Sequence, residues 1–389
     1  MDKIRNVVDS RRCIGCGNCV STCKKNAISF KVVNGFLYPD VDLGKCNNCG
    51  VCDSLCPIDC HDIFLSDPKE YYAAYVQQNE MRLNTTSGGL CTFASEEIIR
   101  RGGVVFSVML TDEWKAVYSK VEKKEDLSNH VGSRYMQAES NNVQRDIASE
   151  LKGGKSVLLI GTPCFVSAVK KFLKENRINP QNFVTIDFLC HGVPSAEIAS
   201  AFIKSLEKKD KKLENYNFRS KKGGWGRLLR SVKYVDEQEK VVRADFCPLH
   251  TWFGRHLSLR ESCFKCDYRN INRPSDITVA DFWKIDRLYP DFPMKQGVSA
   301  VQINTGCGER FFMDLLKTGK IVSKSVSKES IWGHRKTGLK NFAKPPEYDV
   351  FWNVWNNLGL LGLKKKFPPM TYFKLLIAKI KSFFYRGNI

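Results

Sequence analysis

The stretch CIGCGNCVSTCKKN, residues 13–26, opens a pattern that organises the N-terminal part of the chain. Its four cysteines are separated by two, two and three residues. A second run, CNNCGVCDSLCP, begins at Cys46 and repeats all four positions at a constant offset of 33 residues. Two complete sets of thiols at one offset predict a duplicated site for metal or redox groups.

The length and the cysteine content of the chain indicate its number of domains, its cellular compartment and the use of its cysteines. The chain has 389 residues, enough for two or three domains with cores of their own, and 16 cysteines. The N-terminal residues MDKIRNVVDSRRC lack the apolar core of a signal peptide, and no apolar run approaches the ~20 residues of a membrane-spanning helix. We therefore expect a cytoplasmic protein whose cysteines serve metal or redox chemistry rather than disulfides.

The segment between the two cysteine runs predicts a hairpin, because Asn34-Gly35 stands between strand-like residues. Residues 1–66 thus resemble a bacterial-type ferredoxin with two 4Fe-4S clusters, an α+β module. In that pattern the fourth cysteine of each run serves the other cluster. The resemblance implies one cluster on Cys13, Cys16, Cys19 and Cys56, and a second on Cys46, Cys49, Cys52 and Cys23.

Three details of this module qualify the resemblance. Lys24 stands where a proline frequently follows the fourth cysteine, whereas Pro57 keeps that proline in the second run. Cys60 is a further cysteine nearby, which we interpret as a packed or spare thiol. Zinc, which also accepts four thiolates, is the alternative occupant of both sites.

The net charge of +20 indicates the class of partner. Each cluster with its four thiolates carries about −2, so two clusters leave roughly +16 and three leave roughly +14. A basic protein favours acidic electron carriers such as ferredoxin, a redox partner subunit and phosphorylated cofactors. We expect no nucleic-acid binding, because no recognised nucleic-acid motif accompanies the charge.

Beyond the module the sequence alternates between helical and strand-like periods. We expect a linker and helix over 65–89, a helix over 92–101, a strand over 102–110 and a helix over 141–152. Two apolar strands then end at Cys164 and Cys190, each followed by a helical segment. This order predicts an α/β domain with a mainly parallel or mixed sheet after the small module.

Cys164 and Cys190 share the carboxyl edge of the predicted sheet, where ligand sites of open α/β sheets gather. Cys263 and Cys266 add a second pair further along. Together the four thiols are candidates for one more metal centre, either an iron–sulfur cluster or zinc. The alternative is that the first two are core thiols and the second two an isolated pair.

Several segments in order carry a resemblance to a known family: TSGGLCT (86–92), VGSRYMQAE (131–139), GTPCFVSAVKKFL (161–173), DFLCHGVPS (187–195) and LRESCFKCDYRNINRPSDITVADFW (259–283). Together they resemble the coenzyme F420 hydrogenase/dehydrogenase beta-subunit family over about residues 70–310. We assign residues 70–345 to this domain and 346–389 to a basic tail. The chain departs from the family pattern at Ala280 and Phe165, where glycine and glutamine are usual.

The resemblance implies an FAD-binding flavoprotein with iron–sulfur clusters. It places a third 4Fe-4S cluster on Cys164, Cys190, Cys263 and Cys266. It places flavin contacts at Ser87, Gly88 and Gly89, and at Ser133, Arg134 and Tyr135. His191, beside Cys190, is a candidate proton donor, with a purely structural histidine as the alternative.

The tail mixes apolar and cationic residues, with seven basic and no acidic side chains from Lys364 to Ile389. This composition favours peripheral contact with the anionic inner face of a membrane, and a helix docked on the body is the alternative.

Three functions follow from these patterns. The first is an oxidoreductase that passes electrons through clusters to FAD and on to a substrate; association of the family with surface-polysaccharide enzymes suggests that setting. The second is an electron-transfer subunit of a larger complex with catalysis on a partner, and the third is a zinc-binding interaction protein. The substrate stays open among F420, ferredoxin and a sugar or polyisoprenoid intermediate. No GxGxxG fingerprint follows a strand, so we do not expect direct NAD(P) use.

Overall fold

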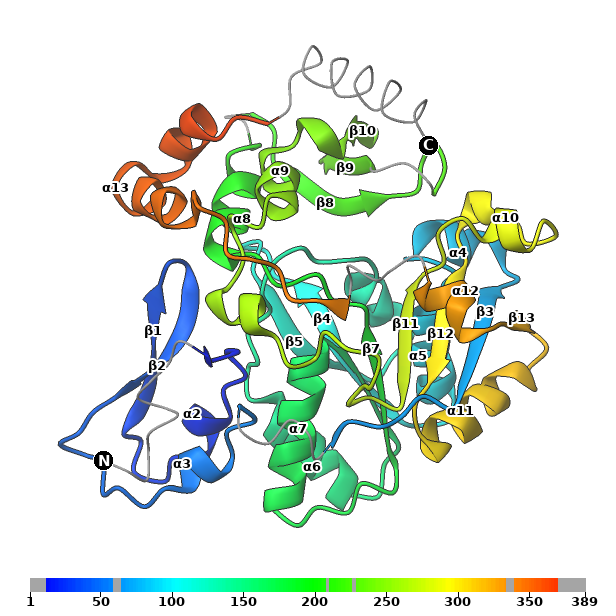
Figure 1. The fold of residues 1–389 in the computed structure, drawn as a ribbon, viewed down its shortest axis with the longest axis horizontal. Coiled ribbons are helices and arrows are strands. Elements are labelled where there is room, and N and C mark those ends of the chain that lie inside the picture. Colours follow the sequence, from blue (N-terminus) through cyan, green and yellow to red (C-terminus); the bar gives the residue numbers. More distant parts are fainter. Residues whose placement is uncertain (1–11, 59–63, 208–209, 226–228, 334–338, 370–389) are drawn as a thin grey trace.

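The computed structural model describes residues 12–58, 64–207, 210–225, 229–333 and 339–369. A small N-terminal module lies beside a larger α/β body (Figure 1). In the module, β1 (Ile28–Val33) and β2 (Phe36–Val41) pair antiparallel with Val33 opposite Phe36. Asn34 and Gly35 both have positive φ, 51° and 65°, as a tight hairpin turn requires, so the predicted hairpin is confirmed.

The internal repeat is visible in the two short helices of the module. Helix α2 (Asn18–Thr22) and helix α3 (Val51–Ser54) each follow a left-handed glycine, Gly17 and Gly50. The two helices contact each other, and α2 also contacts α7 (Pro163–Glu175) of the body. The module is therefore packed on the body through its first cysteine run.

The body is built on an eight-stranded sheet in the order β13-β3-β12-β11-β7-β6-β4-β5. The pairs β11–β7, β7–β6 and β6–β4 are parallel, and the other pairs are antiparallel. The α/β prediction is confirmed, with a mixed sheet. Its strands are β3 (Glu70–Val76), β4 (Val104–Leu110), β5 (Ala116–Val121), β6 (Val157–Gly161), β7 (Phe183–Phe188), β11 (Ile277–Asp281), β12 (Ser299–Ile303) and β13 (Ile321–Ser325).

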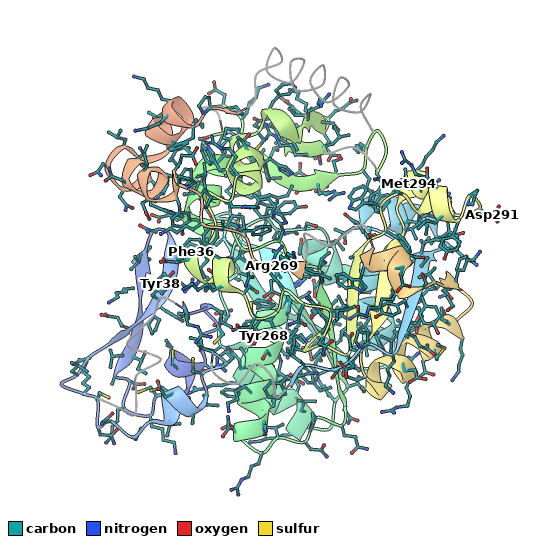
Figure 2. All side chains as sticks on the ribbon, in the orientation of Figure 1. Phe36, Tyr38, Tyr268, Arg269, Asp291 and Met294 are labelled. Carbon is teal, nitrogen blue, oxygen red and sulfur yellow. The ribbon has the colours of Figure 1, made fainter. Side chains whose placement is uncertain are left out.

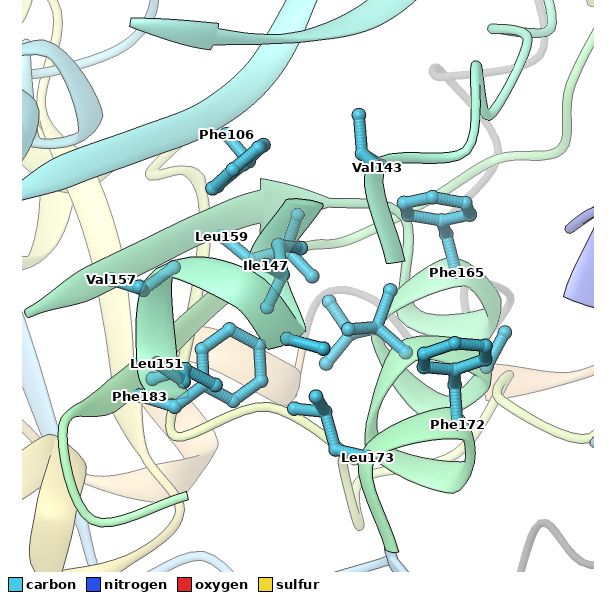
Figure 3. Packing of buried hydrophobic residues seen from close by; sticks show 14 of the residues in the cluster. Phe106, Val143, Ile147, Leu151, Val157, Leu159, Phe165, Phe172, Leu173 and Phe183 are labelled. Atoms are coloured by element: carbon cyan, nitrogen blue, oxygen red, sulfur yellow. The ribbon is translucent and has the colours of Figure 1, made fainter. Parts of the chain in front are cut away.

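Helices bury both faces of this sheet. Val104 and Phe106 of β4 pack against α6 (Val143–Lys152) and α7 (Pro163–Glu175), as Figure 3 shows for Phe106, Ile147 and Phe172. Val105, between them, points to the opposite face. That face is covered by α5 (Leu90–Arg100) and α11 (Gly306–Leu316).

A second, three-stranded antiparallel sheet, which the sequence patterns did not predict, has the order β10-β9-β8. Its strands are β8 (Leu213–Ser220), β9 (Leu229–Tyr234) and β10 (Lys240–Arg243). Phe218 of β8 packs with Phe202 of α8 (Ala196–Lys204). The remaining short elements are α4 (Asn79–Asn84), η4 (Glu125–His130), η5 (Ala244–Phe246), α9 (Pro248–Gly254), η6 (Glu261–Lys265), α10 (Ile285–Leu288), η7 (Met294–Gln296) and α12 (Lys328–Trp332).

Three sequence predictions are wrong in detail. The linker predicted from residue 65 contains β3, which lies between β12 and β13; its sequence EYYAAYV shows no alternation, and Ala73 and Ala74 are fully buried on opposite faces. Strand β6 ends at Gly161, so Cys164 lies in the first turn of α7 rather than at the strand end. Likewise β7 ends two residues before Cys190.

The final described helix, α13 (Tyr348–Lys366), forms the first half of the predicted tail. Phe351 and Leu363 are fully buried and pack with Trp252 of α9 and Phe36 of the module. This half is therefore a helix docked on the body. Residues 370–389, on which the membrane prediction mainly rests, lie outside the described residues. Among the described helices, none combines the length and apolar character needed to cross a bilayer.

The core cluster of Figure 3 predicts a large cost for truncation. Leu159 of β6 is fully buried, so Leu159→Ala should lower the free energy of unfolding by about 2–5 kcal/mol. Leu361→Ala is the matched control, because the Leu361 side chain is 79% exposed and should cost less than about 0.5 kcal/mol. Anaerobic urea unfolding of both variants measures the difference, and equal losses would contradict the packing.

Candidate redox site

The first set of N-terminal thiols converges beside α7. Burial raises the pKa of the Cys16 thiol, and negative charge on Cys56, Cys19 and Cys13 raises it further. The pKa of Cys19 is raised by burial first, and then by Cys13 and Cys56. The structure therefore brings Cys56, from the second run, next to three cysteines of the first run, the arrangement that the ferredoxin resemblance implies.

The second set gathers around β1 and lies close to the first, since Cys19 belongs to the same hydrophobic cluster. Cys23 packs with Cys46 and Cys52 around Ile28. Burial raises the pKa of Cys52 to about 11, with Asp53 and Cys49 contributing further. Each set contains one buried thiol, Cys16 in the first and Cys52 in the second, and the second set also contains the exposed Cys49.

Backbone N–H groups point at several of these sulfurs. Gly15 N donates to Cys13 Sγ at 3.3 Å, Ala27 N to Cys23 Sγ at 3.4 Å, and Asn48 N to Cys46 Sγ at 3.4 Å. Such bonds stabilise a thiolate over a thiol. The loops therefore supply the electrostatic support that cluster ligands need.

The third set comes from three separate segments of the body. Cys164 lies in α7, Cys190 follows β7, Cys263 lies in η6 and Cys266 caps η6. Burial raises the pKa of Cys190 to about 12, and charge on Cys263 and Cys266 adds to the rise. Burial likewise raises the pKa of Cys266 to about 11, with Cys164 contributing next. The fold thus brings all four thiols together.

Cations and backbone donors surround this third set. Gly192 N donates to Cys190 Sγ at 3.3 Å, and Val193 N to Cys263 Sγ at 3.4 Å. The charge of Arg273 favours the thiolates of Cys190 and Cys266. Four half-buried thiols with positive charge and amide donors nearby fit an anionic iron–sulfur cluster. In the described part of the chain, no three His, Cys, Asp or Glu side chains are placed to hold a single metal ion.

A cavity of about 620 Å³ lies between the third set and the sheet. Cys164, Cys190 and His191 line one side. Ile14 and Gly15, from the first ligand loop of the module, also line it. Two thiols of the third set and the loop beside Cys13 therefore border one cavity, which is large enough for a cofactor. The four thiols of the first set line a separate, small pocket next to that loop.

Of the residues predicted to contact flavin, some line the cavity and others do not. Ser133, Arg134 and Tyr135 line the cavity, as does Ser87. Arg134 Nε is buried without a hydrogen-bond partner among the described residues, and burial lowers the pKa of Arg134 to about 10. Such a donor suits an anionic ligand group.

Gly88 and Gly89 are not among the lining residues. A Cβ atom at Gly88 would lie 2.5 Å from the Ala74 carbonyl oxygen and 2.8 Å from Ser299 N. Gly88 N donates to Ser299 Oγ at 3.0 Å. The need for glycine here arises from packing on the protein's own sheet.

Sequence reasoning missed Lys221, a buried cation on the cavity wall. Its Nζ donates to the carbonyl oxygens of Arg82 (2.5 Å), Ser87 and Gln296 (3.1 Å). Burial lowers the pKa of Lys221 to about 7. Lys221 thus ties the loop at Ser87 to the loop at Gln296. It lies in the segment FRSKKGGWG (218–226), which supports the family resemblance, but nothing in that segment singles out Lys221.

Trp225, Trp283 and Arg219 form another wall. The two indole rings stack at 4.4 Å, with Trp225 nearly fully buried and its Nε1 lacking a partner in the described structure. Arg219 pairs with Asp281 at 3.1 Å and lies over the Trp283 ring at 4.9 Å. This wall offers both aromatic surface and hydrogen-bond donors.

His191 lines the cavity, and its Nε2 lies 3.0 Å from Nε2 of His256. Burial lowers the pKa of His191 to about 4, with His256 and Arg269 contributing. Its role as a proton donor stays a prediction.

Comparison with known proteins identifies two domains. Residues 154–329 match the family described as the C terminus of the coenzyme F420 hydrogenase/dehydrogenase beta subunit, and residues 12–60 match the 4Fe-4S dicluster domain. An uncharacterized ferredoxin of Methanocaldococcus jannaschii is 33% identical over 64 residues, covering 16% of this chain and 83% of that protein.

Two larger relatives each match less than half of the chain. A coenzyme F420-dependent sulfite reductase of M. jannaschii is 25% identical over 171 residues, covering 43% of this chain and 26% of that protein. An F(420)H(2) dehydrogenase subunit of Methanosarcina mazei is 22% identical over 202 residues, covering 48% of this chain and 56% of that protein. The chain thus spans about a quarter and about half of their lengths.

Among solved structures, a chain of the F420-reducing NiFe hydrogenase complex from Methanosarcina barkeri, studied by xenon derivatization, is similar at 15% identity. Its TM-score is 0.47, with 78% of this chain and 92% of that chain covered.

Gly297 tests the packing of the loop at Ser87. It has φ of 97°, and a Cβ atom there would overlap the Ser87 carbonyl oxygen. Gly297→Ala should therefore cost more than about 2 kcal/mol of unfolding free energy, from left-handed strain plus overlap. Gly319→Ala is the control: φ is 70° but no described atom lies within 4 Å, so strain alone should cost about 1 kcal/mol. Thermal melting compares them, and a smaller loss for Gly297→Ala would contradict the contact.

The lowered pKa of Lys221 predicts that the free energy of unfolding depends on pH. With a pKa of about 7 in the folded protein and about 10 in the unfolded chain, the unfolded chain binds the extra proton between these pH values. Stability contributed by Lys221 therefore rises with pH above 7. The unfolding free energy of wild type minus that of Lys221→Met should increase from pH 7 to 9, by at most about 1.4 kcal/mol per pH unit. Exposed Lys152→Met gives the background, and a difference that falls with pH would refute the burial effect.

Proposed function

Because the chain belongs to the coenzyme F420 hydrogenase/dehydrogenase beta-subunit family and carries a 4Fe-4S dicluster domain, we propose that it is an iron–sulfur flavoprotein oxidoreductase. Electrons would pass from the N-terminal clusters through a third cluster to a flavin in the central cavity. The observation that carries this proposal is the shared wall: Gly15 of the module and Cys164 and Cys190 of the third set border the same cavity.

The cavity suits FAD through its unpaired donors and its aromatic surfaces. Arg134 Nε, Arg219 Nη2 and Trp225 Nε1 are buried without partners among the described residues, and all three residues line the cavity. They would bind phosphate and ring acceptors. The stacked pair Tyr118 and Phe165, 3.9 Å apart, adds an apolar wall. A bound flavin supplies the conversion between one-electron and two-electron transfer.

The position of the cavity orders the relay. Ile14 and Gly15, beside the first set, line the cavity, so the first set would be the inner end and the second set, which contains exposed Cys49, the outer end. Exposed Lys24 and Lys25 follow Cys23 at the outer end. Their charge favours an acidic one-electron carrier as the donor or acceptor there.

The second candidate is an electron-transfer subunit whose catalysis takes place on a partner. The M. mazei relative is by its name a subunit, and this chain covers 56% of it. In this case the chain would hold the same clusters, and a partner subunit would dock where the relay ends.

Metal and flavin analysis of anaerobically purified protein tests the proposal. We expect about twelve irons with matching labile sulfide and one flavin for three clusters. Cys263→Ala should lose about four irons while both N-terminal clusters stay. Cys91→Ala is the matched control, because Cys91 is a thiol on the same cavity outside every proposed ligand set. Zinc without labile sulfide, or an unchanged iron content in Cys263→Ala, would overturn the assignment.

Reoxidation of the reduced protein by candidate acceptors would identify the substrate. Anaerobic assays with F420, ferredoxin and nucleotide sugars compare the acceptors that the family resemblance implies, the sugars representing surface-polysaccharide metabolism. Reoxidation by a small molecule with flavin turnover supports the enzyme. Reoxidation by protein carriers alone supports the subunit.

A further inference from the structure

Arg260 stands where the third thiol set begins. Its backbone N donates to Val193 O at 3.0 Å, and its carbonyl accepts from Cys263 N at 3.0 Å. It is the residue that caps η6, the turn that carries Cys263. The backbone of Arg260 therefore shapes the loop of the third set.

The side chain of Arg260 reaches back to the module and is fully buried. Nε donates to Cys13 O at 2.7 Å, and Nη2 donates to Leu37 O at 2.9 Å. The guanidinium lies 4.1 Å from the ring of Tyr38 and 5.4 Å from that of Phe36. Figure 2 shows both rings on the side of the module that faces the body.

Gln137 extends this contact to the cavity. Arg260 Nη1 donates to Gln137 Oε1 at 2.8 Å, and Gln137 Nε2 donates to Ile14 O at 3.0 Å. Gln137, Ile14 and Gly15 all line the cavity. A Cβ atom at Gly15 would lie 3.1 Å from Arg260 Nη1, so the first ligand loop packs directly on the guanidinium.

Among the described residues, the charge of Arg260 has no carboxylate partner. Its side-chain hydrogen bonds run to two backbone carbonyls and one amide oxygen, all of them neutral. A fully buried cation is costly unless negative charge lies nearby. Its neighbours are the loops of Cys13 and Cys263, and iron–sulfur clusters there would each carry about −2.

We propose that Arg260 is a positioning residue that holds the Cys13 cluster in register with the cluster on Cys263, and that its charge raises the reduction potential of the Cys13 cluster. The inference rests on the proposed function in that both thiol sets hold 4Fe-4S clusters. The step it serves moves one electron from the reduced module cluster to the third cluster, with no bond made or broken. The electron originates from a one-electron carrier, or from dithionite in the experiment.

Anaerobic redox titration followed by electron paramagnetic resonance tests the charge. Arg260→Met removes the cation, so the Cys13 cluster should become harder to reduce. We expect a shift of about tenfold in the reduction equilibrium, which is about 59 mV for one electron. Arg260→Lys keeps the charge and should stay near wild type. Arg255→Met is the matched control, because Arg255 pairs with Glu347 at the surface.

Hydrogen exchange of the amides of residues 13–16 tests the positioning. Both Arg260 variants should exchange faster there than wild type, because neither side chain reproduces the planar fork that holds Cys13, Leu37 and Gln137 together. Arg255→Met should leave this exchange unchanged.

The outcomes separate the two parts of the inference. A cluster-loaded Arg260→Met with wild-type potential overturns the role of the charge, and wild-type exchange overturns the role in positioning. If Arg260→Met does not load clusters, Arg260→Lys tests both parts. A reduction equilibrium shifted by about tenfold in Arg260→Lys would contradict the role of the charge. A wild-type exchange rate in Arg260→Lys would contradict the role in positioning. Iron analysis of the wild-type protein distinguishes failure of the proposed function from failure of this inference. About eight irons would show that the third cluster is not bound, and the potential of the Cys13 cluster could still be measured.

Discussion

A buried polar seam between the module and helices α6 and α7 determines how the thiol sets are placed relative to one another. Asn18 Nδ2 donates to Leu55 O at 3.0 Å within the module and to Ala168 O at 2.9 Å on α7. Gln144 Nε2 donates to Cys16 O at 2.5 Å and to Asn18 Oδ1 at 3.1 Å. Because Ala168 lies one turn after Cys164 on the same helix, the seam joins the first and third thiol sets in one frame. Buried hydrogen bonds of this kind favour one docking geometry over others, since any shift leaves polar atoms unsatisfied.

Charge is distributed around this frame in a way that suits anionic groups. The chain has a net charge of +20, and part of that positive charge is buried. Arg273 is almost fully buried and pairs with fully buried Asp187 at 3.3 Å, while its charge also favours the thiolates of Cys190 and Cys266. The side chain of Arg260 donates to neutral acceptors. Positive charge removed from water near thiols lowers the cost of making those thiols negative, which cluster binding requires.

The sequence predicts the repeated and periodic parts of this structure well. The offset of 33 residues identified both cysteine runs, and Asn34-Gly35 identified the hairpin, because each signal is local. Strand β3 was missed because it is buried on both faces and carries no alternation. The three-stranded sheet was missed because β8 has two register shifts that break the alternation of its sequence LENYNFRS, and β10 has only four residues. The role of Lys221 could not be predicted, because its partners, the carbonyl groups of Arg82, Ser87 and Gln296, come from distant segments.

The segment TSGG illustrates why a motif and its physical cause can differ. Glycines beside a cofactor are ordinarily explained by close approach of the ligand, but Gly88 packs on Ala74 and Ser299 of the sheet. The Ser87 hydroxyl donates to Val298 O at 2.9 Å, and Lys221 Nζ ties the Ser87 carbonyl to the opposite loop. The loop is thus held by hydrogen bonds and packing within the protein. Because a rigid wall lowers the ordering cost of binding, the glycines would favour a ligand in the cavity indirectly, by restricting the residues beside them.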